Sequence, residues 1–316
     1  MLALTEITPW HWGGFIAVIL VFLALDLGVF HRKAHVIDFK EALFWTFIWF
    51  SVAMVFAFAL AAWRSKEESL EFITGYIIEL SLSMDNVFVI ALIFCYFRVP
   101  LLYQHRVLFW GILGALVMRG VMIGVGAALV ERFHWMLYVF GGFLLLTGIK
   151  MIFADDDAGV QPEKNPVLRA ARKFFPVSSD FDGQKFITRI DGRVALTPLA
   201  LVLLMVETTD LVFAVDSIPA IFSVTQKPFV VFTSNVFAIL GLRSLYFVLA
   251  NAIGYFRFLK IGLSIVLVFI GGKMLLAIWK IHLPTATSLM IVAGIITTSI
   301  VYSMIVGRPG QGKSQE

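Results

Sequence analysis

The chain has 316 residues, of which 60% are hydrophobic and 15% are charged, and its mean hydropathy is +0.91. A soluble domain carries roughly 25% charged residues, so this composition excludes a water-soluble globular protein. The apolar segments between the charge clusters exceed the roughly 20 residues that cross a bilayer. We therefore expect an all-α polytopic membrane protein.

The excess of basic residues does not indicate nucleic-acid binding. The formal net charge is +4, but the 25 Lys and Arg residues are spread over short connectors. This distribution is typical of membrane topology, so we expect membrane lipid and no nucleic acid among the partners. The single cysteine, Cys95, excludes an intrachain disulfide and a cluster of thiolate metal ligands.

Hydrophobic runs predict nine membrane-spanning helices. In chain order we expect them at 10–30, 42–63, 70–97, 107–130, 135–153, 196–223, 229–250, 256–279 and 284–306. The first run is too long for a signal-peptide core and follows no basic segment, so we expect it to stay in the mature protein. Within the soluble segment 154–195, alternating residues around Asp191-Gly192 predict a small β-hairpin.

The basic residues also predict the orientation in the membrane. Nine of them follow the first, third, seventh and ninth spans, whereas five lie in the connectors on the opposite side. By the positive-inside rule, the N-terminus lies outside, and the soluble segment and the C-terminus lie in the cytoplasm.

An internal duplication organises the predicted spans. Asp85 and Asp210 lie in matching motifs 125 residues apart, and Arg119 and Arg243 match at an offset of 124. Each copy contains three spans, so the second copy enters the membrane from the opposite side, as in many secondary transporters. The expected divisions are two N-terminal helices (1–69), the first repeat (70–153), a cytoplasmic loop (154–195), the inverted repeat (196–279), a last helix (284–306) and a cytoplasmic tail (307–316).

Acidic residues inside the predicted spans indicate a polar site near the midplane. A carboxylate at a helix centre costs about 2.5 to 3.5 kcal/mol on insertion scales, so several acids there are expected to face one another or a polar path. Inverted symmetry brings equivalent positions such as Asp85 and Asp210 together where these folds bind substrate. The candidate metal ligands are Glu79, Asp85, Asn86, Glu207, Asp210 and Asp216, with support from Asp26, Ser83, Arg119, Arg243 and Ser217.

Helical spacing predicts how part of this set is arranged. Glu79, Ser83 and Asn86 share one helical face, and Glu207 and Asp210 are one turn apart. Carboxylates, an amide and hydroxyls are hard oxygen donors, which suit Mg²⁺, Ca²⁺ or Mn²⁺. Five span acids and two arginines carry a formal charge of −3, which favours a divalent cation or protons.

The remaining acids predict irregular helices. Asp85 and Asp216 fall off these faces if the helices are regular, so we expect both helices to be unwound or kinked near the midplane. Ser81 and Thr208 could bond freed carbonyls, and Pro219 lacks a backbone donor.

Three features of the site have two interpretations each. Arg119 and Arg243 are counter-ions to the acids, or they take part in releasing the bound ion. Asp26 either caps the first span or is a ligand on the way into the site. The acids as a whole either bind an ion or form a purely structural polar network.

The segments that contain these acids resemble the TerC family of integral membrane proteins, and within it the Alx-type branch. The matching motifs are ELSLSMDNVFV (79–89), FAVDSIPA (213–220), TSNVFAILGLR (233–243) and GGKM (271–274). The resemblance implies a nine-helix bacterial inner-membrane protein of the LysE-like transporter superfamily. It also implies Mn²⁺ export that uses Glu79, Asp85, Glu207, Asp210 and Asp216, with tellurium resistance and alkaline or redox stress as associated phenotypes.

We therefore expect a Mn²⁺ exporter that is not an enzyme and holds no permanently bound cofactor, with protons as a plausible counter-substrate. The alternative is a membrane scaffold or redox modulator that delivers metal to exported enzymes through partner proteins at the hairpin loop. An intramembrane aspartyl protease is disfavoured because no GxGD motif surrounds Asp85 or Asp210. Ca²⁺ and Mg²⁺ stay open as alternatives, because cavity size and not ligand type separates them from Mn²⁺.

Overall fold

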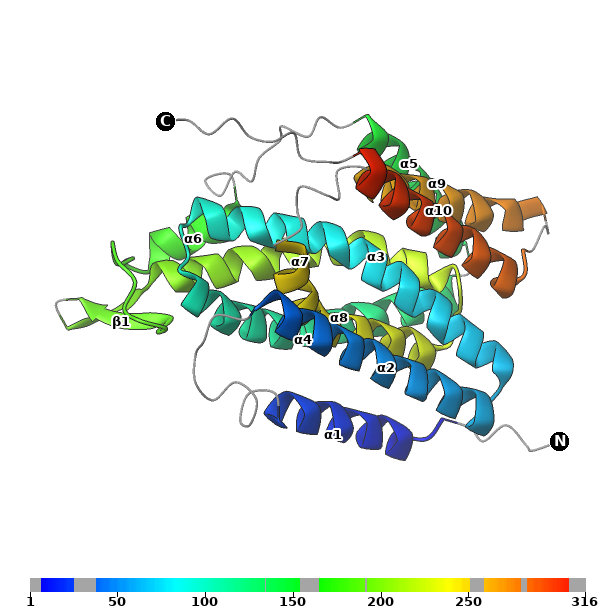
Figure 1. Cartoon of the computed structure of the whole chain (residues 1–316), viewed down its shortest axis with the longest axis horizontal. Helices are drawn as coiled ribbons and strands as arrows, with labels where there is room; N and C mark the ends of the chain where they lie inside the picture. Colours follow the sequence, from blue (N-terminus) through cyan, green and yellow to red (C-terminus); the bar gives the residue numbers. More distant parts are fainter. Residues whose placement is uncertain are drawn as a thin grey trace.

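The computed structural model describes residues 7–25, 38–133, 135–153, 165–190, 192–250, 259–279 and 283–306. Within helices, the description leaves out the side chains of Asp85, Phe88, Ala250, Leu259, Lys260 and Met304. These ranges form helices and one small β-hairpin (Figure 1). The elements are α1 (Pro9–Leu25), α2 (Phe39–Trp63), α3 (Lys66–Tyr96), α4 (Leu101–Arg132), α5 (Met136–Ile152), α6 (Pro166–Phe174), β1 (Ile187–Ile190), β2 (Arg193–Leu196), α7 (Pro198–Phe222), α8 (Pro228–Ala250), α9 (Leu259–Leu276), a 3₁₀ turn (Ala277–Trp279) and α10 (Thr285–Val306).

Seven of the described helices are long and apolar enough to cross a membrane, namely α2, α3, α4, α7, α8, α9 with its 3₁₀ extension, and α10. The helices α1 and α5 are apolar but shorter, at 17 residues each. The all-α polytopic membrane class is confirmed, and the exact number of nine spans stays a prediction. The largest shift in a boundary is at α4, which begins at Leu101 rather than near residue 107.

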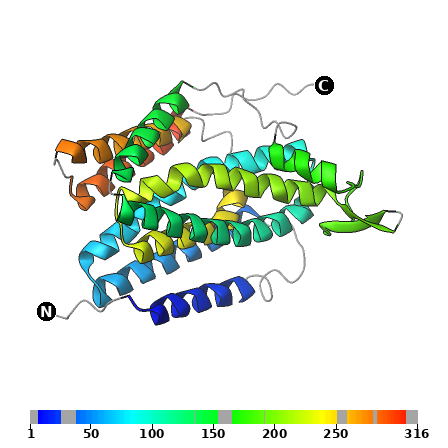
Figure 2. The ribbon, with the colours of Figure 1, turned by 180° about the vertical axis from the view of Figure 1, so that it is seen from behind.

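The helices form two groups that lie side by side (Figure 1 and Figure 2). In the first group, α3 and α4 each pack against both α7 and α8, and α2 packs against α3 and α8. In the second group, α9 packs against α5 and α10. Glycine permits the α5–α9 contact, because a Cβ atom on Gly271 would lie 2.6 Å from the backbone nitrogen of Leu145.

The predicted hairpin is present at one end of the first group, which we call the hairpin end (Figure 1). Its strands are antiparallel, with Ile190 opposite Arg193 and Ile187 opposite Leu196. Gly192 has a φ of +77°, a left-handed conformation that glycine adopts without steric cost.

A short helix before the hairpin, α6, has no counterpart in the predicted elements. Asn165 caps it by accepting hydrogen bonds from the backbone of Val167 (2.9 Å) and Leu168 (3.2 Å), and Pro166 begins it. Leu168 is 2% exposed and packs with residues of α7. This helix was missed because three of its nine residues are basic and it carries no long apolar run.

Some ionisable side chains lie inside the bundle among apolar core residues, whereas many other apolar side chains face outward. Phe47 and Phe58 of α2 are 67% and 76% exposed, whereas Glu79 of α3 is fully buried and Arg119 of α4 is 1% exposed. This arrangement is stable in lipid, because hydrocarbon solvates the apolar surface and ionisable groups pair in the interior. The buried ionisable residues are therefore the place to look for function.

Candidate ion-binding site

An arginine of α4 joins two carboxylates from two other helices. The Arg119 guanidinium donates from Nη2 to Asp210 Oδ1 of α7 at 2.9 Å and from Nε to Asp210 Oδ2 at 3.3 Å. Its Nη1 also donates to Glu79 Oε1 of α3. The three side chains are mostly buried, with Arg119 2%, Glu79 0% and Asp210 15% exposed. We call Glu79, Arg119, Asp210 and the polar residues bonded to them the central cluster.

Three further side chains hold Glu79 and Arg119 in place. Ser83 donates to Glu79 Oε1 at 3.4 Å, and Asn235 of α8 donates from Nδ2 to Glu79 Oε2 at 3.3 Å. Arg119 Nη1 donates to Asn235 Oδ1 at 2.9 Å and to Ser217 Oγ at 3.4 Å. All four helices of the first group that surround the centre thus contribute to the cluster.

Asn86 has one satisfied and one unsatisfied polar atom. Its Nδ2 donates to Asp210 Oδ1 at 3.4 Å, which adds Asn86 to the central cluster. Its Oδ1 is buried and has no hydrogen-bond partner among the described residues. A buried amide oxygen without a donor is costly, so it is suited to a ligand that supplies positive charge. The preceding residue, Asp85, belongs to α3, but its side chain lies outside the description.

Glu207 lies beside the central cluster and packs against a glycine. A Cβ atom on Gly114 of α4 would lie 2.0 Å from Glu207 Oε1, so the carboxylate occupies the space that a larger residue would fill. Asp210 follows Glu207 by one turn of α7, as the spacing predicts.

Two predicted residues lie apart from the direct bonds of the cluster. Asp216 is next to Thr147 of α5, and no bond joins it to the cluster in the part of the chain that the structure describes. Arg243 is 6% exposed and, with Asp210, lines a cavity of about 30 Å³ between otherwise apolar residues. That volume accommodates a water molecule or a small ion.

The prediction that α3 and α7 are unwound near the midplane is wrong, and a kink there, the other form of that prediction, stays a prediction. Both helices are continuous, from Lys66 to Tyr96 and from Pro198 to Phe222. The hydroxyls of Ser81, Thr208 and Thr209 donate to the carbonyls four residues earlier, at 2.6, 2.5 and 2.8 Å. They add bonds to an intact helix and do not replace lost ones. Pro219 lies in the last turn of α7, and the helix continues past it to Phe222.

Within the described part of the chain, the central cluster brings charged side chains together but does not form a complete set of metal ligands. Among the described residues, no three His, Cys, Asp or Glu side chains are placed to hold a metal ion together. The guanidinium of Arg119 occupies the space between Glu79 and Asp210. A cation could therefore bind both carboxylates only if the guanidinium moved away.

Sequence reasoning missed Asn235 and Gly114. Asn235 is fully buried and bonds to both Glu79 and Arg119. A polar amide inside an apolar span was the available signal, since such residues normally bond across helices. For Gly114 the sequence carries no signal, because its partner Glu207 is known only from the packing. Asp26 lies outside the described residues.

Comparisons with known proteins agree on one family. The family model described as "Integral membrane protein TerC family" matches residues 64–311. A Myxococcus xanthus protein named "Uncharacterized membrane protein STKORF319" is 54% identical over 302 residues, which cover 95% of this chain and 94% of the relative. Proteins named "Putative membrane-bound redox modulator Alx" are 45% identical in Escherichia coli K12, over 93% of this chain and 94% of the relative, and 42% in Photorhabdus laumondii, over 95% and 96%. No solved structure matches the chain.

Proposed function

The chain belongs to the integral membrane protein TerC family, and we propose that it is a divalent-cation transporter of the bacterial inner membrane that exports Mn²⁺. On this proposal the metal is cargo and not a resident cofactor, and the protein is not an enzyme. The N-terminus lies outside and the hairpin lies in the cytoplasm, as the basic residues of the connectors predict.

The observation that carries the proposal is the buried amide oxygen of Asn86. It has no donor among the described residues, and its own amide group bonds to Asp210. The carboxylates of Asp210 and Glu79 lie on either side of Arg119, so hard oxygen ligands are concentrated in one place. A purely structural network would be expected to pair this oxygen as well.

The position of Arg119 suggests how binding and release are coupled. The guanidinium already neutralises Glu79 and Asp210, so it competes with any divalent cation for the same oxygens. A cation that displaces it gains two carboxylates, and the return of the guanidinium expels the cation. Protons are the proposed counter-substrate, because site carboxylates that the guanidinium does not pair accept a proton when the metal leaves.

Transport by the purified full chain in proteoliposomes that contain a Mn²⁺-quenched dye tests the proposal. We expect Asp210→Asn and Asp85→Asn to reduce Mn²⁺ flux at least tenfold, and Asn86→Leu to reduce it as well. Asp182→Asn is the matched control, because this exposed carboxylate lies in the loop at the hairpin end and should leave flux unchanged. A pH gradient that accelerates flux would add proton antiport.

Two outcomes would overturn the proposal. The first is wild-type flux in folded Asp210→Asn and Asp85→Asn proteins. The second is the absence of both Mn²⁺ flux and calorimetric Mn²⁺ binding in the wild-type protein. Competition with Ca²⁺ and Mg²⁺ in the same vesicles measures selectivity.

A second candidate function follows from the name of the Alx relatives, which calls them redox modulators. On this alternative the protein is a scaffold that passes metal to exported enzymes through partners at the hairpin. Its only thiol, Cys95, cannot form an intrachain disulfide, so a redox effect would act through partners or metal. A pull-down with residues 186–196 replaced by a flexible linker separates the two, because only the scaffold predicts loss of both partners and phenotype.

A further inference from the structure

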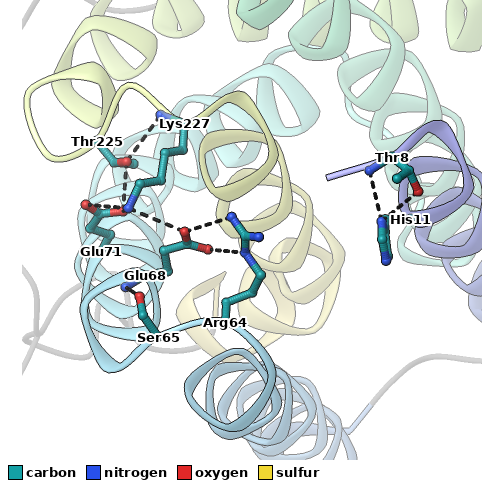
Figure 3. A network of polar contacts seen from close by, with 8 residues as sticks. All are labelled: Thr8, His11, Arg64, Ser65, Glu68, Glu71, Thr225 and Lys227. Carbon is teal, nitrogen blue, oxygen red and sulfur yellow. Dashed lines mark hydrogen bonds and ion pairs between the residues drawn. The ribbon is translucent and has the colours of Figure 1, made fainter. Parts of the chain in front are cut away.

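A second ion-pair network ties the start of α3 to the connection between α7 and α8. It lies at the end of the bundle opposite the hairpin, and Figure 3 shows it from close by. Lys227 Nζ lies 3.5 Å from Glu68 Oε1 and 3.1 Å from Glu71 Oε2, so one ammonium bridges two carboxylates. Arg64 donates to both oxygens of Glu68, at 2.9 and 3.0 Å, and Thr225 donates to Glu71 Oε2 at 2.9 Å. We call these five residues the end network.

Burial differs sharply within the end network. The side chains of Glu68 and Glu71 are 6% and 9% exposed, whereas that of Lys227 is 44% exposed. The ammonium therefore lies between the buried carboxylates and the outside. A cavity of about 320 Å³, lined by Trp12, Lys227 and Phe229 among others, adjoins the network and has room for a displaced lysine side chain.

A stripe of polar residues leads from the end network to the central cluster. Glu68, Glu71, Glu79, Ser83 and Asn86 lie on one face of α3, and each is less than 10% exposed. Glu71 and Glu79 are eight residues apart, or about 12 Å along the helix. Between Glu71 and Glu79, α3 lies in close contact with α8, so the polar face is covered there. A Cβ atom on Gly75 would lie 2.9 Å from Ser234 Oγ of α8.

We propose that the polar face of α3 is one half of the ion pathway and that Lys227, together with Arg64, is the latch that closes its end. Within the latch, Lys227 holds α3 to the α7–α8 connection through Glu68 and Glu71, and Arg64 pairs with Glu68 from the turn between α2 and α3. When these ion pairs break, α3 separates from α8 along Gly75 and Ser234, and the central cluster becomes accessible from that end. The inference rests on the proposed function for the identity of the cargo. The orientation predicted above makes this the outer end.

Cysteine labelling tests the latch without any metal. The parent protein carries Cys95→Ala and Ser234→Cys, so its single thiol lies on the buried stripe, at a position that is fully buried. A membrane-impermeant cationic methanethiosulfonate reagent is added to the outside of intact cells or oriented proteoliposomes. We expect Lys227→Met with Arg64→Met to raise the labelling rate at least tenfold, and Lys227→Arg to leave it near that of the parent.

Two controls separate opening of the latch from other effects. Arg132→Met removes an exposed positive charge from the same end of the bundle and should not change the labelling of Ser234→Cys. A cysteine at Ala53 of α2, also fully buried, reports general loosening and should stay unlabelled in the latch variant.

The labelling outcomes decide the inference. Unchanged labelling in the double latch variant overturns it, as does equal labelling at Ala53→Cys. Increased labelling at Ser234→Cys alone supports the latch, whether or not the protein transports Mn²⁺. Flux without a labelling change would support the proposed function and overturn the latch, so the two can fail separately.

Discussion

The central cluster and the end network use the same kinds of residues and differ in burial. In the centre, the side chains of Arg119 and Glu79 are 2% and 0% exposed. At the end, Lys227 is 44% exposed beside carboxylates that are nearly buried. A third pair, Lys185 and Asp182 near the hairpin, is 68% and 42% exposed. The three ion pairs form a series from the interior of the bundle to its surface.

The comparison shows that the residue types of an ion pair do not by themselves determine how much the pair contributes to the free energy of unfolding. Removing one partner of a buried pair leaves the other charge without solvent, which costs about 3 to 5 kcal/mol. An exposed pair contributes about 0 to 1 kcal/mol, because water and salt screen both charges. We expect the centre to be required for folding and the end to be free to open and close.

The largest effect is expected for Arg119→Met. The change leaves Glu79 and Asp210 facing one another without a counter-ion, so the free energy of unfolding should fall by about 3 to 5 kcal/mol. Thermal unfolding of the detergent-purified protein measures the loss. Adding Asp210→Asn should recover part of it, because fewer unpaired charges remain. A melting temperature equal to that of the wild type would show that the cluster is not the buried anchor inferred here.

A smaller effect near the centre is expected for Gly114→Ala. The new methyl group would meet the Glu207 carboxylate, whose nearest oxygen lies 2.0 Å from the Cβ position. The carboxylate of Glu207 is at the end of a flexible side chain, so it moves aside. We expect this overpacking to lower the free energy of unfolding by about 1 to 3 kcal/mol. The same change at Gly124 of α4 is the control, because no atom lies within 4 Å of its Cβ position. Gly124→Ala should be neutral or stabilising by up to about 1 kcal/mol.

The end network should tolerate the loss of its lysine. In Lys227→Met, Glu68 keeps Arg64 and Glu71 keeps Thr225. Screening of the half-exposed ammonium limits the destabilisation to about 1 kcal/mol. Raising the salt concentration should lower the melting temperature of the wild type more than that of the variant. A loss as large as that of Arg119→Met would break the proposed order of the series.

The smallest effect is a local pH dependence near the hairpin. Hydrogen bonds from Thr188 and Lys185, together with the positive charge of Lys185, lower the pKa of Asp182 below its ordinary value of 3.8. Because the folded pKa is the lower one, the stabilisation is complete above the unfolded pKa and is lost as the pH falls through the folded one. The protection of the hairpin amides from hydrogen exchange, measured relative to the intrinsic exchange rate at each pH, should therefore fall below about pH 4, the ordinary range of an Asp carboxyl. In Asp182→Asn this pH dependence should disappear; if it persists, another group is responsible.

Much of the fold could be predicted from apolar runs and turn residues. The hairpin was located correctly by Asp191-Gly192, because a two-residue turn needs a residue such as Gly192 with positive φ. The shared face of Glu79, Ser83 and Asn86 followed from helical periodicity and is confirmed by their burial. These features depend on local geometry, which the sequence determines directly.

The remaining parts of the site depend on packing between helices. The pairing of Arg119 with Glu79 and Asp210 selects one of several acids within reach, and spacing along the chain does not identify it. The end network was missed because Glu68 and Lys227 lie just outside the predicted spans 70–97 and 229–250, and only acids inside the spans were considered as site residues. Their contact requires the start of α3 and the start of α8 to meet in space.

The close contact between the backbones of α5 and α9 at their glycine residues has a mechanical consequence. A Cβ atom on Gly148 would lie 2.9 Å from the Ser264 carbonyl oxygen, and one on Gly271 would lie 2.7 Å from the Gly141 carbonyl oxygen. Backbones in direct contact have no long side chains between them that could change rotamer and take up a displacement. We expect α5 and α9 to translate and rotate as one rigid rod, so that any rocking of this pair is taken up at its contacts with α3, α7 and α10.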